Sequence, residues 1–92
     1  MDIVIYTNSK TLSKKKSNGI YDWHHWTFSR MPQKIDEFDR IYFACNGEIQ
    51  GSFLAENIND DKKEIGWYWN TWVKSKGKMP CKQFRGFRYK WW

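Results

Sequence analysis

The stretch FDRIYFACNGEIQGSFLAEN, residues 38–57, decides the fold. Two apolar runs in it flank Asn46-Gly47, and an Asn-Gly pair in that setting is a strong short-range signal of a β-hairpin. Side chains alternate between the two faces of a strand, so the length of the loop determines which residues share a face. The stretch therefore predicts two antiparallel strands whose register follows from parity.

The apolar pattern favours a hairpin with one extra residue. A two-residue loop would place Phe43 opposite Gln50 and would mix apolar with polar side chains on each face. A three-residue loop through Glu48, or an equivalent bulge, instead places Gly51 opposite Phe43, where a glycine leaves room for the ring. This register pairs Cys45 with Ile49 and Ile41 with Phe53, and it predicts one apolar face of Ile41, Phe43, Cys45, Ile49, Phe53 and Ala55.

The rest of the chain predicts further strands around this hairpin. β-branched and aromatic residues favour strands, whereas Asn, Ser and Gly favour turns. We expect one domain over residues 1–92, of the α+β class but mostly β, with five or six strands in a small closed barrel or strongly curved sheet. The expected segments are strands at Ile3–Tyr6, Tyr21–Phe28, Glu64–Val73 and Lys82–Trp92, a loop or single helical turn over residues 8–19, and a basic loop at Lys74–Pro80.

Length and composition exclude several classes of protein. Ninety-two residues are near the lower limit for a stable core, but seven Trp, six Phe and five Tyr offer large apolar surfaces. No apolar run approaches the roughly 18 residues that a membrane span needs. The opening MDIVIYTNSK lacks the layout of a signal peptide. We therefore expect a cytoplasmic protein without membrane contact, in which Cys45 and Cys81 are reduced thiols.

The net charge of +6 is concentrated near the two ends of the sequence. Residues 1–16 carry +3 and residues 17–73 carry −4, whereas residues 74–92 hold seven basic side chains and no acid. A concentrated basic region is typical of a surface that binds phosphates, although a solvated face that aids solubility fits the charge equally well.

No catalytic or metal-binding motif stands out. His24 and His25 are adjacent and would point to opposite faces of a strand, so they cannot share a metal, and we expect neither a metal nor a cofactor. Cys45 falls on the predicted apolar face and is expected to be inert. Cys81 lies in the basic loop, where nearby cations could lower the pKa of its thiol, but no base lies close in the sequence.

What does stand out is aromatic residues alternating with cations and histidines, as in WHHW and FRGFRYKWW. Single-stranded nucleic acids are held by rings that stack on bases, next to Lys and Arg that neutralise phosphates. Strand parity divides the last segment, with Phe87, Tyr89 and Trp91 beside Arg85, and Arg88, Lys90 and Trp92 beside Phe84. We place the basic groove on the second face, and the predicted nucleic-acid-binding residues are Lys82, Arg85, Arg88, Lys90, Trp92, Trp26, His25 and Arg30.

One segment resembles a known superfamily. Residues 32–57 are similar to the central part of PUA-like domains of the ASCH and EVE type, in which a turn ending in an acid enters a strand and a glycine-containing hairpin follows. Asp39, Gly47 and Gly51 occupy those positions, and Phe38 stands where ASCH domains tend to have glycine. The resemblance implies a compact barrel with one or two short helices and a groove for RNA or a modified base.

Three functions are compatible with the sequence. The first is a non-catalytic module that binds nucleic acid, with RNA favoured and a nucleoprotein complex as a further partner. The second is an ASCH-like hydrolase or ribonuclease acting on RNA or a modified nucleoside, with Lys10, Thr11 and Glu48 as candidates. The third is a protein-binding inhibitor or adaptor, such as a phage-encoded inhibitor of a nuclease complex of the anti-CRISPR kind.

Overall fold

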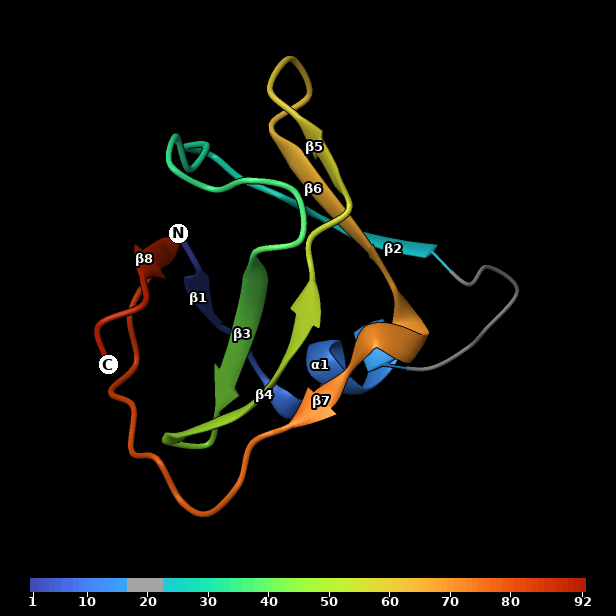
Figure 1. Ribbon diagram of the computed structural model, residues 1–92. Helices are drawn as coiled ribbons and strands as arrows, with labels where there is room; N and C mark the ends of the chain where they lie inside the picture. Colours follow the sequence, from blue (N-terminus) through green and yellow to red (C-terminus); the bar gives the residue numbers. More distant parts are fainter. Residues whose placement is uncertain (17–22) are drawn as a thin grey trace.

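The computed structural model describes residues 1–16 and 23–92 (Figure 1). Over these residues it is an α+β fold made mostly of strands, as expected, with one α-helix and two sheets. The elements are β1 (Ile3–Tyr6), α1 (Ser9–Lys16), β2 (Trp23–Thr27), β3 (Arg40–Cys45), β4 (Glu48–Leu54), β5 (Asn57–Asn59), β6 (Glu64–Tyr68), the 3₁₀ turn η1 (Trp69–Thr71), β7 (Val73–Lys74) and β8 (Phe87–Tyr89).

The first sheet has the order β7-β4-β3-β1-β8. Its strand β1 runs parallel to β3 and antiparallel to β8, with Ile3 paired with both Ile41 and Tyr89. Because Ile3, Val4 and Ile5 are all fully buried, β1 is covered on both faces, as a central strand is in most parallel sheets. The N-terminal strand therefore occupies an interior position in the sheet.

The second sheet has the order β2-β6-β5, and β2 and β5 both pair antiparallel with β6. The strands β5 and β6 form an arm that β2 crosses (Figure 1). No strand pairing joins this sheet to the first one into a ring in the described part of the chain, so the expected closed barrel stays unconfirmed.

The hairpin forms with the bulge that parity requires, but at a different position. Asn46 and Gly47 make a two-residue turn, both with positive φ, and Cys45 pairs with Glu48 instead of Ile49. Gln50 is the extra residue of β4, because Ala44 pairs with Ile49 and Phe43 with Gly51. The predicted pair of Ile41 with Phe53 is confirmed. Ile49, which lies before the bulge, consequently faces the side of the sheet opposite to the other predicted apolar residues.

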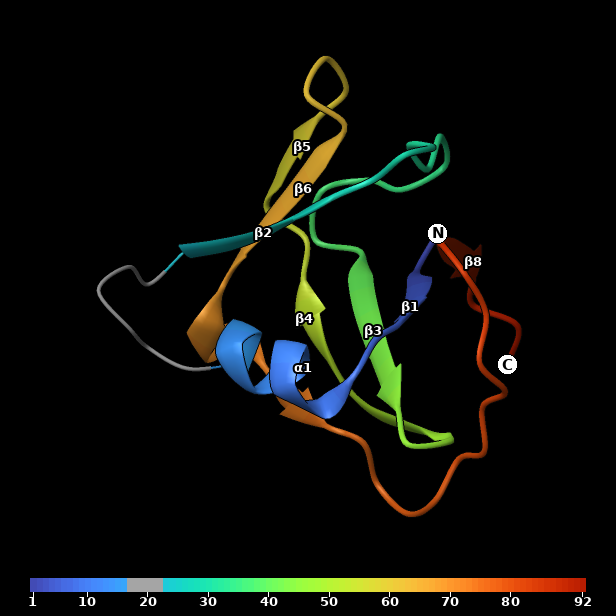
Figure 2. The ribbon, with the colours of Figure 1, turned by 180° about the vertical axis from the view of Figure 1, so that it is seen from behind.

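Three other predicted segments need correction. Residues 8–16 contain the eight-residue helix α1, because Asn8 accepts the Thr11 N–H at 2.7 Å and so caps its first turn. The predicted strand Glu64–Val73 breaks after Tyr68 into η1, which contacts α1 (Figure 2). The predicted last strand is confined to β8, and the chain before it runs beside the β3–β4 hairpin, where Pro80 forms a β-bridge with Glu48. Tyr21 and Asp22 of the second predicted strand, like residues 17–19, lie outside the described residues.

The main core fills the space between the two sheets. We call the side of the first sheet that faces it the inner face, with Ile3, Ile5 and Phe43 among its residues. The outer face of the same sheet carries a smaller buried cluster, against which the C-terminal segment packs. The main core consists of Ile3, Ile5, Leu12, Phe28, Met31, Ile35, Ile41, Phe43, Cys45, Phe53, Ala55, Ile65 and Trp67, and the outer cluster of Val4, Ala44, Ile49 and Cys81.

Gly51 leaves room for Trp72 and β7, which corrects the expectation that it accommodates Phe43. A Cβ atom at this position would lie 2.5 Å from the Trp72 ring and 2.5 Å from the Val73 carbonyl oxygen. The Val73 oxygen belongs to the backbone of β7, which pairs with β4 here, so the contact cannot be relieved by a side-chain rotation. The glycine is therefore required by close backbone approach.

We expect Gly51→Ala to destabilise the protein by about 1–3 kcal/mol, because overpacking would push β7 and Trp72 away from β4. The free energy of unfolding in urea measures the effect. A useful comparison is Gly77→Ala, where the added methyl group meets no described atom within 4 Å apart from neighbouring residues, so that only the strain of a φ of +71° acts. A change of less than about 0.5 kcal/mol for Gly51→Ala would show that the close approach of β7 is not important for stability.

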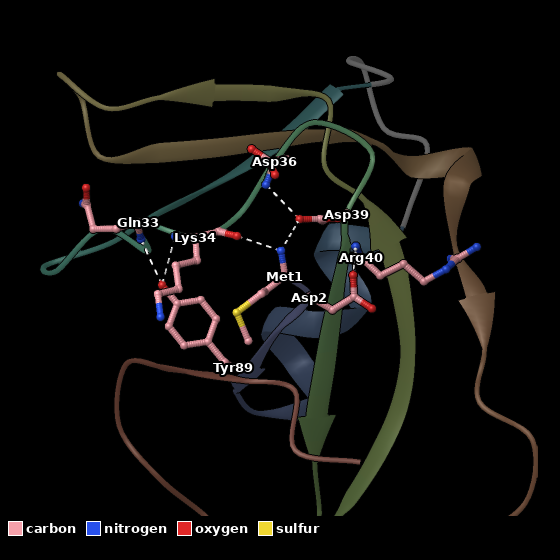
Figure 3. Close-up of polar contacts among 8 residues, drawn as sticks. All are labelled: Met1, Asp2, Gln33, Lys34, Asp36, Asp39, Arg40 and Tyr89. Carbon is pink, nitrogen blue, oxygen red and sulfur yellow. Dashed lines mark hydrogen bonds and ion pairs between the residues drawn. The ribbon is translucent and has the colours of Figure 1, made fainter.

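The N-terminal ammonium group is held inside a turn that precedes β3 (Figure 3). It donates to Asp39 Oδ2 at 2.6 Å and to the Lys34 carbonyl oxygen at 2.7 Å. Asp39 Oδ2 also accepts the Asp36 N–H at 2.8 Å. The neighbouring Asp2 carboxylate accepts the Arg40 N–H at 2.8 Å. Met1 and Asp2, the two residues before β1, therefore both bind the chain around this turn by hydrogen bonds.

This arrangement makes stability depend on acid pH. The hydrogen bond from the N-terminal ammonium, followed by that from the Asp36 N–H, lowers the pKa of the Asp39 carboxyl group. A carboxyl group with a lowered folded pKa stabilises the native state above its unfolded pKa of about 3.9, and the contribution is lost as the pH falls through the folded value.

We therefore expect Asp39→Asn to destabilise the protein by about 1 kcal/mol at neutral pH, and the difference from wild type to shrink as the pH falls below about 4. Urea unfolding at a series of pH values tests this. Asp61→Asn, an exposed position in the β5–β6 turn, is the matched control. A difference that stays constant down to pH 2 would show that the Asp39 charge contributes nothing.

A candidate nucleic-acid interface

A groove of about 920 Å³ opens where β2 approaches the segment that leads into β8. Phe28 and Phe87 both line the groove and contact each other, with ring centroids 5.9 Å apart. The end of β1 and the tip of the β3–β4 hairpin form the remaining wall. The lining residues are Tyr6, Thr7, Asn8, Trp26, Thr27, Phe28, Ser29, Arg30, Asn46, Gln83, Phe84, Arg85, Gly86 and Phe87.

Trp26 lines this groove from β2. Its neighbours on β2 are exposed, whereas its ring packs edge-on against Phe43 of the core with a centroid distance of 5.6 Å. The Lys15 ammonium lies 5.8 Å from the centroid of the same ring and donates to the His25 carbonyl oxygen at 2.8 Å. Burial lowers the pKa of Lys15. Trp26 is thus fixed from two sides and only half-buried.

The groove combines rings, cations and amides, and none of the described residues that line it is acidic. Arg30 and Arg85 are both exposed on its rim. Asn8, which lines the groove, caps α1, so the positive end of the helix dipole borders the same space. The Tyr6 hydroxyl accepts the Gly47 N–H at 2.7 Å and ties the wall to the hairpin. Such a surface attracts anions and offers ring surface to a planar group.

The structure divides the predicted site residues into separate groups. Trp26, Arg30 and Arg85 meet in the groove. Lys82 lines an adjoining hollow of about 540 Å³ together with Tyr6, which also lines the groove. His25 is exposed and does not line the groove.

The other three predicted residues lie on the outer face of the first sheet. The Arg88 guanidinium lies 4.9 Å from the centroid of the Phe84 ring. The Lys90 ammonium lies 5.3 Å from the centroid of the Trp92 ring. The predicted grouping of Arg88, Lys90 and Phe84 on one side is therefore observed, and Phe87 and Tyr89 pack against the core as expected.

Trp91 departs from the parity prediction. It does not join Phe87 and Tyr89 but contacts Phe84 and Trp92, at centroid distances of 6.4 Å and 5.0 Å. The reason is that β8 ends at Tyr89, so strand alternation no longer applies to the residues that follow. Both terminal tryptophans consequently lie with the outer-face residues.

Sequence reasoning missed Tyr6 and Phe84 as groove residues, and it missed Lys15 as a contact of the Trp26 ring. The sequence predicts Tyr6 only as a strand residue, because no local signal indicates how the chain turns after it. The predicted position of Phe84 beside Arg88 is correct. Phe84 also lines the groove, and this second position depends on the path of the chain beside the hairpin before β8. That path is set by two backbone hydrogen bonds, from Ile49 N–H to the Met79 oxygen at 2.9 Å and from Cys81 N–H to the Gly47 oxygen at 2.8 Å.

Both cysteines are buried free thiols, on opposite faces of the first sheet. Burial raises the pKa of Cys45, as suits its position in the core. Burial also raises the pKa of Cys81 and outweighs the nearby Arg88 charge, which corrects the expectation of a lowered value. Neither thiol therefore has the lowered pKa that would favour a nucleophilic thiolate.

The hydrolase candidates are not gathered at the groove. Lys10 and Thr11 belong to α1, and Glu48 begins β4, but none of the three lines the groove. Over residues 1–16 and 23–92, no three His, Cys, Asp or Glu side chains come together in a way that could hold a metal ion. The same residues contain no helix of the length and hydropathy needed to cross a bilayer.

Comparison with known proteins adds no relative. No protein-family model, no curated protein and no solved structure matches this chain.

Proposed function

We propose that the protein is a small, non-catalytic module that binds single-stranded nucleic acid, with RNA favoured. The observation that carries this proposal is the groove between β2 and the segment before β8. It joins Trp26, Phe84 and Tyr6 with Arg30 and Arg85, and its lining over residues 1–16 and 23–92 contains no acidic residue.

The groove supplies the two interactions that such a ligand needs. Base stacking on an aromatic side chain is worth about 1–3 kcal/mol per base, and it requires rings that are accessible yet fixed. Trp26 and Phe84 are half-buried and meet this requirement. Arg30 and Arg85 would contact the phosphates on either side of a stacked base, and their guanidinium groups can donate in pairs to phosphate oxygens.

The PUA-like resemblance is in keeping with one backbone detail. Phe38, at the position where ASCH domains tend to have glycine, has a φ of 70° and a ring that is 61% exposed. This is a conformation that glycine adopts without strain, and it supports the proposal that this turn corresponds to the glycine-containing turn of ASCH domains. The assignment to a PUA-like domain is a proposal on this basis.

Fluorescence anisotropy with a labelled single-stranded RNA dodecamer tests the proposal. Binding should be measurable at low salt and should weaken steeply between about 50 and 200 mM salt, since each phosphate contact releases counterions. Competition with the matching DNA strand and with duplex RNA establishes which form is preferred. Absence of binding at low salt, with the protein shown to be folded by circular dichroism, would contradict the proposal.

A further inference from the structure

A continuous series of ring contacts leaves the groove and reaches the outer face of the first sheet. Tyr6 and Phe84, which both line the groove, are 6.0 Å apart between ring centroids. Phe84 contacts Trp91 at 6.4 Å, and Trp91 contacts Trp92 at 5.0 Å. Trp92 in turn contacts Tyr42 of β3 at 5.0 Å. We call these five residues, Tyr6, Phe84, Trp91, Trp92 and Tyr42, the aromatic track.

Cations accompany the track. Arg88 lies over Phe84 at 4.9 Å, and Lys90 lies 5.1 Å from the Tyr42 ring and 5.3 Å from the Trp92 ring. The Lys90 ammonium also donates to the Tyr42 hydroxyl at 3.4 Å. One acidic residue, Asp2, lies beside Lys90, because the Lys90 backbone N–H donates to the Asp2 carbonyl oxygen. The Asp2 carboxylate itself accepts the Arg40 N–H. Positive charge therefore follows the rings.

The ring geometry leaves apolar surface accessible. Every contact along the track is edge-to-face rather than stacked, with interplanar angles between 67° and 81°. In such a contact the two rings do not cover each other's faces completely. Trp91 and Trp92 are 52% and 41% exposed, which is unusual for the largest apolar side chains in a chain of this size.

We propose that the track is the continuation of the binding site, so that the ligand is an extended single strand that starts in the groove and crosses the outer face. This inference rests on the proposed function and specifies its ligand. Bases would stack on the exposed tryptophans while Arg88 and Lys90 contact the intervening phosphates. A duplex hides the faces of its bases and could use only the cations.

The size of the molecule limits the strand. The Cα atoms extend 33 Å along the longest axis, which corresponds to roughly ten stacked nucleotides at about 3.4 Å each. A trinucleotide could occupy the groove alone, whereas a dodecamer would reach the end of the track. The two parts of the site can therefore be tested separately by ligand length.

The experiment compares variants on two labelled oligouridines, a trimer and a dodecamer. Trp91→Ala/Trp92→Ala is expected to weaken dodecamer binding by about 10-fold or more, and to leave trimer binding within about twofold of wild type. Arg85→Ala should weaken both. A longer oligomer can bind in more registers, which raises its apparent affinity for every variant. The decisive quantity is therefore the ratio of the variant's Kd to the wild-type Kd on the same oligomer.

Two controls separate binding from folding. Trp91→Phe/Trp92→Phe keeps the rings and should restore most of the dodecamer affinity, and Phe38→Ala removes an exposed ring elsewhere and should change neither affinity. If the alanine variant binds the dodecamer as wild type does, or weakens trimer and dodecamer equally, the track is not part of the site although the groove remains one. If wild type binds neither oligomer, the proposed function itself fails.

Discussion

Arg30→Glu/Arg85→Glu is expected to reduce the affinity for single-stranded RNA by at least about 100-fold at low salt. Both guanidinium groups lie on the rim of the groove, and reversing them replaces two phosphate contacts with two repulsions. Loss of two contacts should also lower the slope of log affinity against log salt by about 1.4, since each contact to a single strand contributes about 0.7. Anisotropy titrations at several salt concentrations measure both quantities.

A matched variant shows whether the effect is local. Lys34→Glu/Lys62→Glu changes the net charge by the same amount, but neither lysine lines the groove and both are exposed. It should lose only a few-fold in affinity through the long-range field. Equal losses in the two variants would mean that RNA responds to the overall charge of the protein, and the groove would lose its special role.

Phe43→Ala is expected to destabilise the protein by about 3–5 kcal/mol, which is a large part of the stability of a small domain. Phe43 belongs to β3 but contacts Trp26 and Trp67 of the second sheet, at centroid distances of 5.6 and 5.5 Å, and Phe53 of the first sheet at 5.8 Å. Its ring is fully buried, so its removal leaves a cavity between the sheets.

Thermal unfolding followed by circular dichroism measures this effect, with an expected fall of about 15–30 °C in Tm. Val73→Ala, at a strand position that is 51% exposed, should change the stability by no more than about 0.5 kcal/mol. A Tm for Phe43→Ala within 5 °C of wild type would show that this ring does not hold the two sheets together. Because Trp26 rests on Phe43, RNA binding is also expected to weaken in the variant.

The parts of the fold that local patterns specify were predicted well. Asn46-Gly47 determined the hairpin, and the alternation of Ile41, Phe43 and Phe53 determined its register away from the turn. Where the prediction was wrong, two arrangements satisfied the same pattern. A two-residue turn followed by a bulge at Gln50 and a three-residue loop both restore the alternation, and they differ in the pairing of residues 48–50 and so in the side to which Ile49 points.

Long-range features could not be predicted from local patterns. The parallel pairing of β1 with β3 joins residues 38 positions apart, as with Ile3 and Ile41, and no motif in the sequence announces it. The cluster of Trp26, Arg30 and Arg85 depends on the same topology, because it forms only when β8 pairs with β1 and brings its preceding segment towards β2. Residue type identified these side chains as candidates, and tertiary pairing decided which of them meet.

The position of β8 has a consequence for the protein in concentrated solution. This short strand pairs with the edge of β1 that would otherwise be unpaired. The β1 residues Ile3, Val4 and Ile5 present apolar side chains on both faces of the sheet. Unpaired strands of that kind are templates for edge-to-edge association, and natural proteins protect them with short edge strands and charged side chains. Here β8 is the short edge strand, and Arg88 is its exposed cation. Any change that detaches the C-terminal segment would therefore do more than remove half of the proposed site. It would expose an unpaired, apolar strand edge and so favour aggregation.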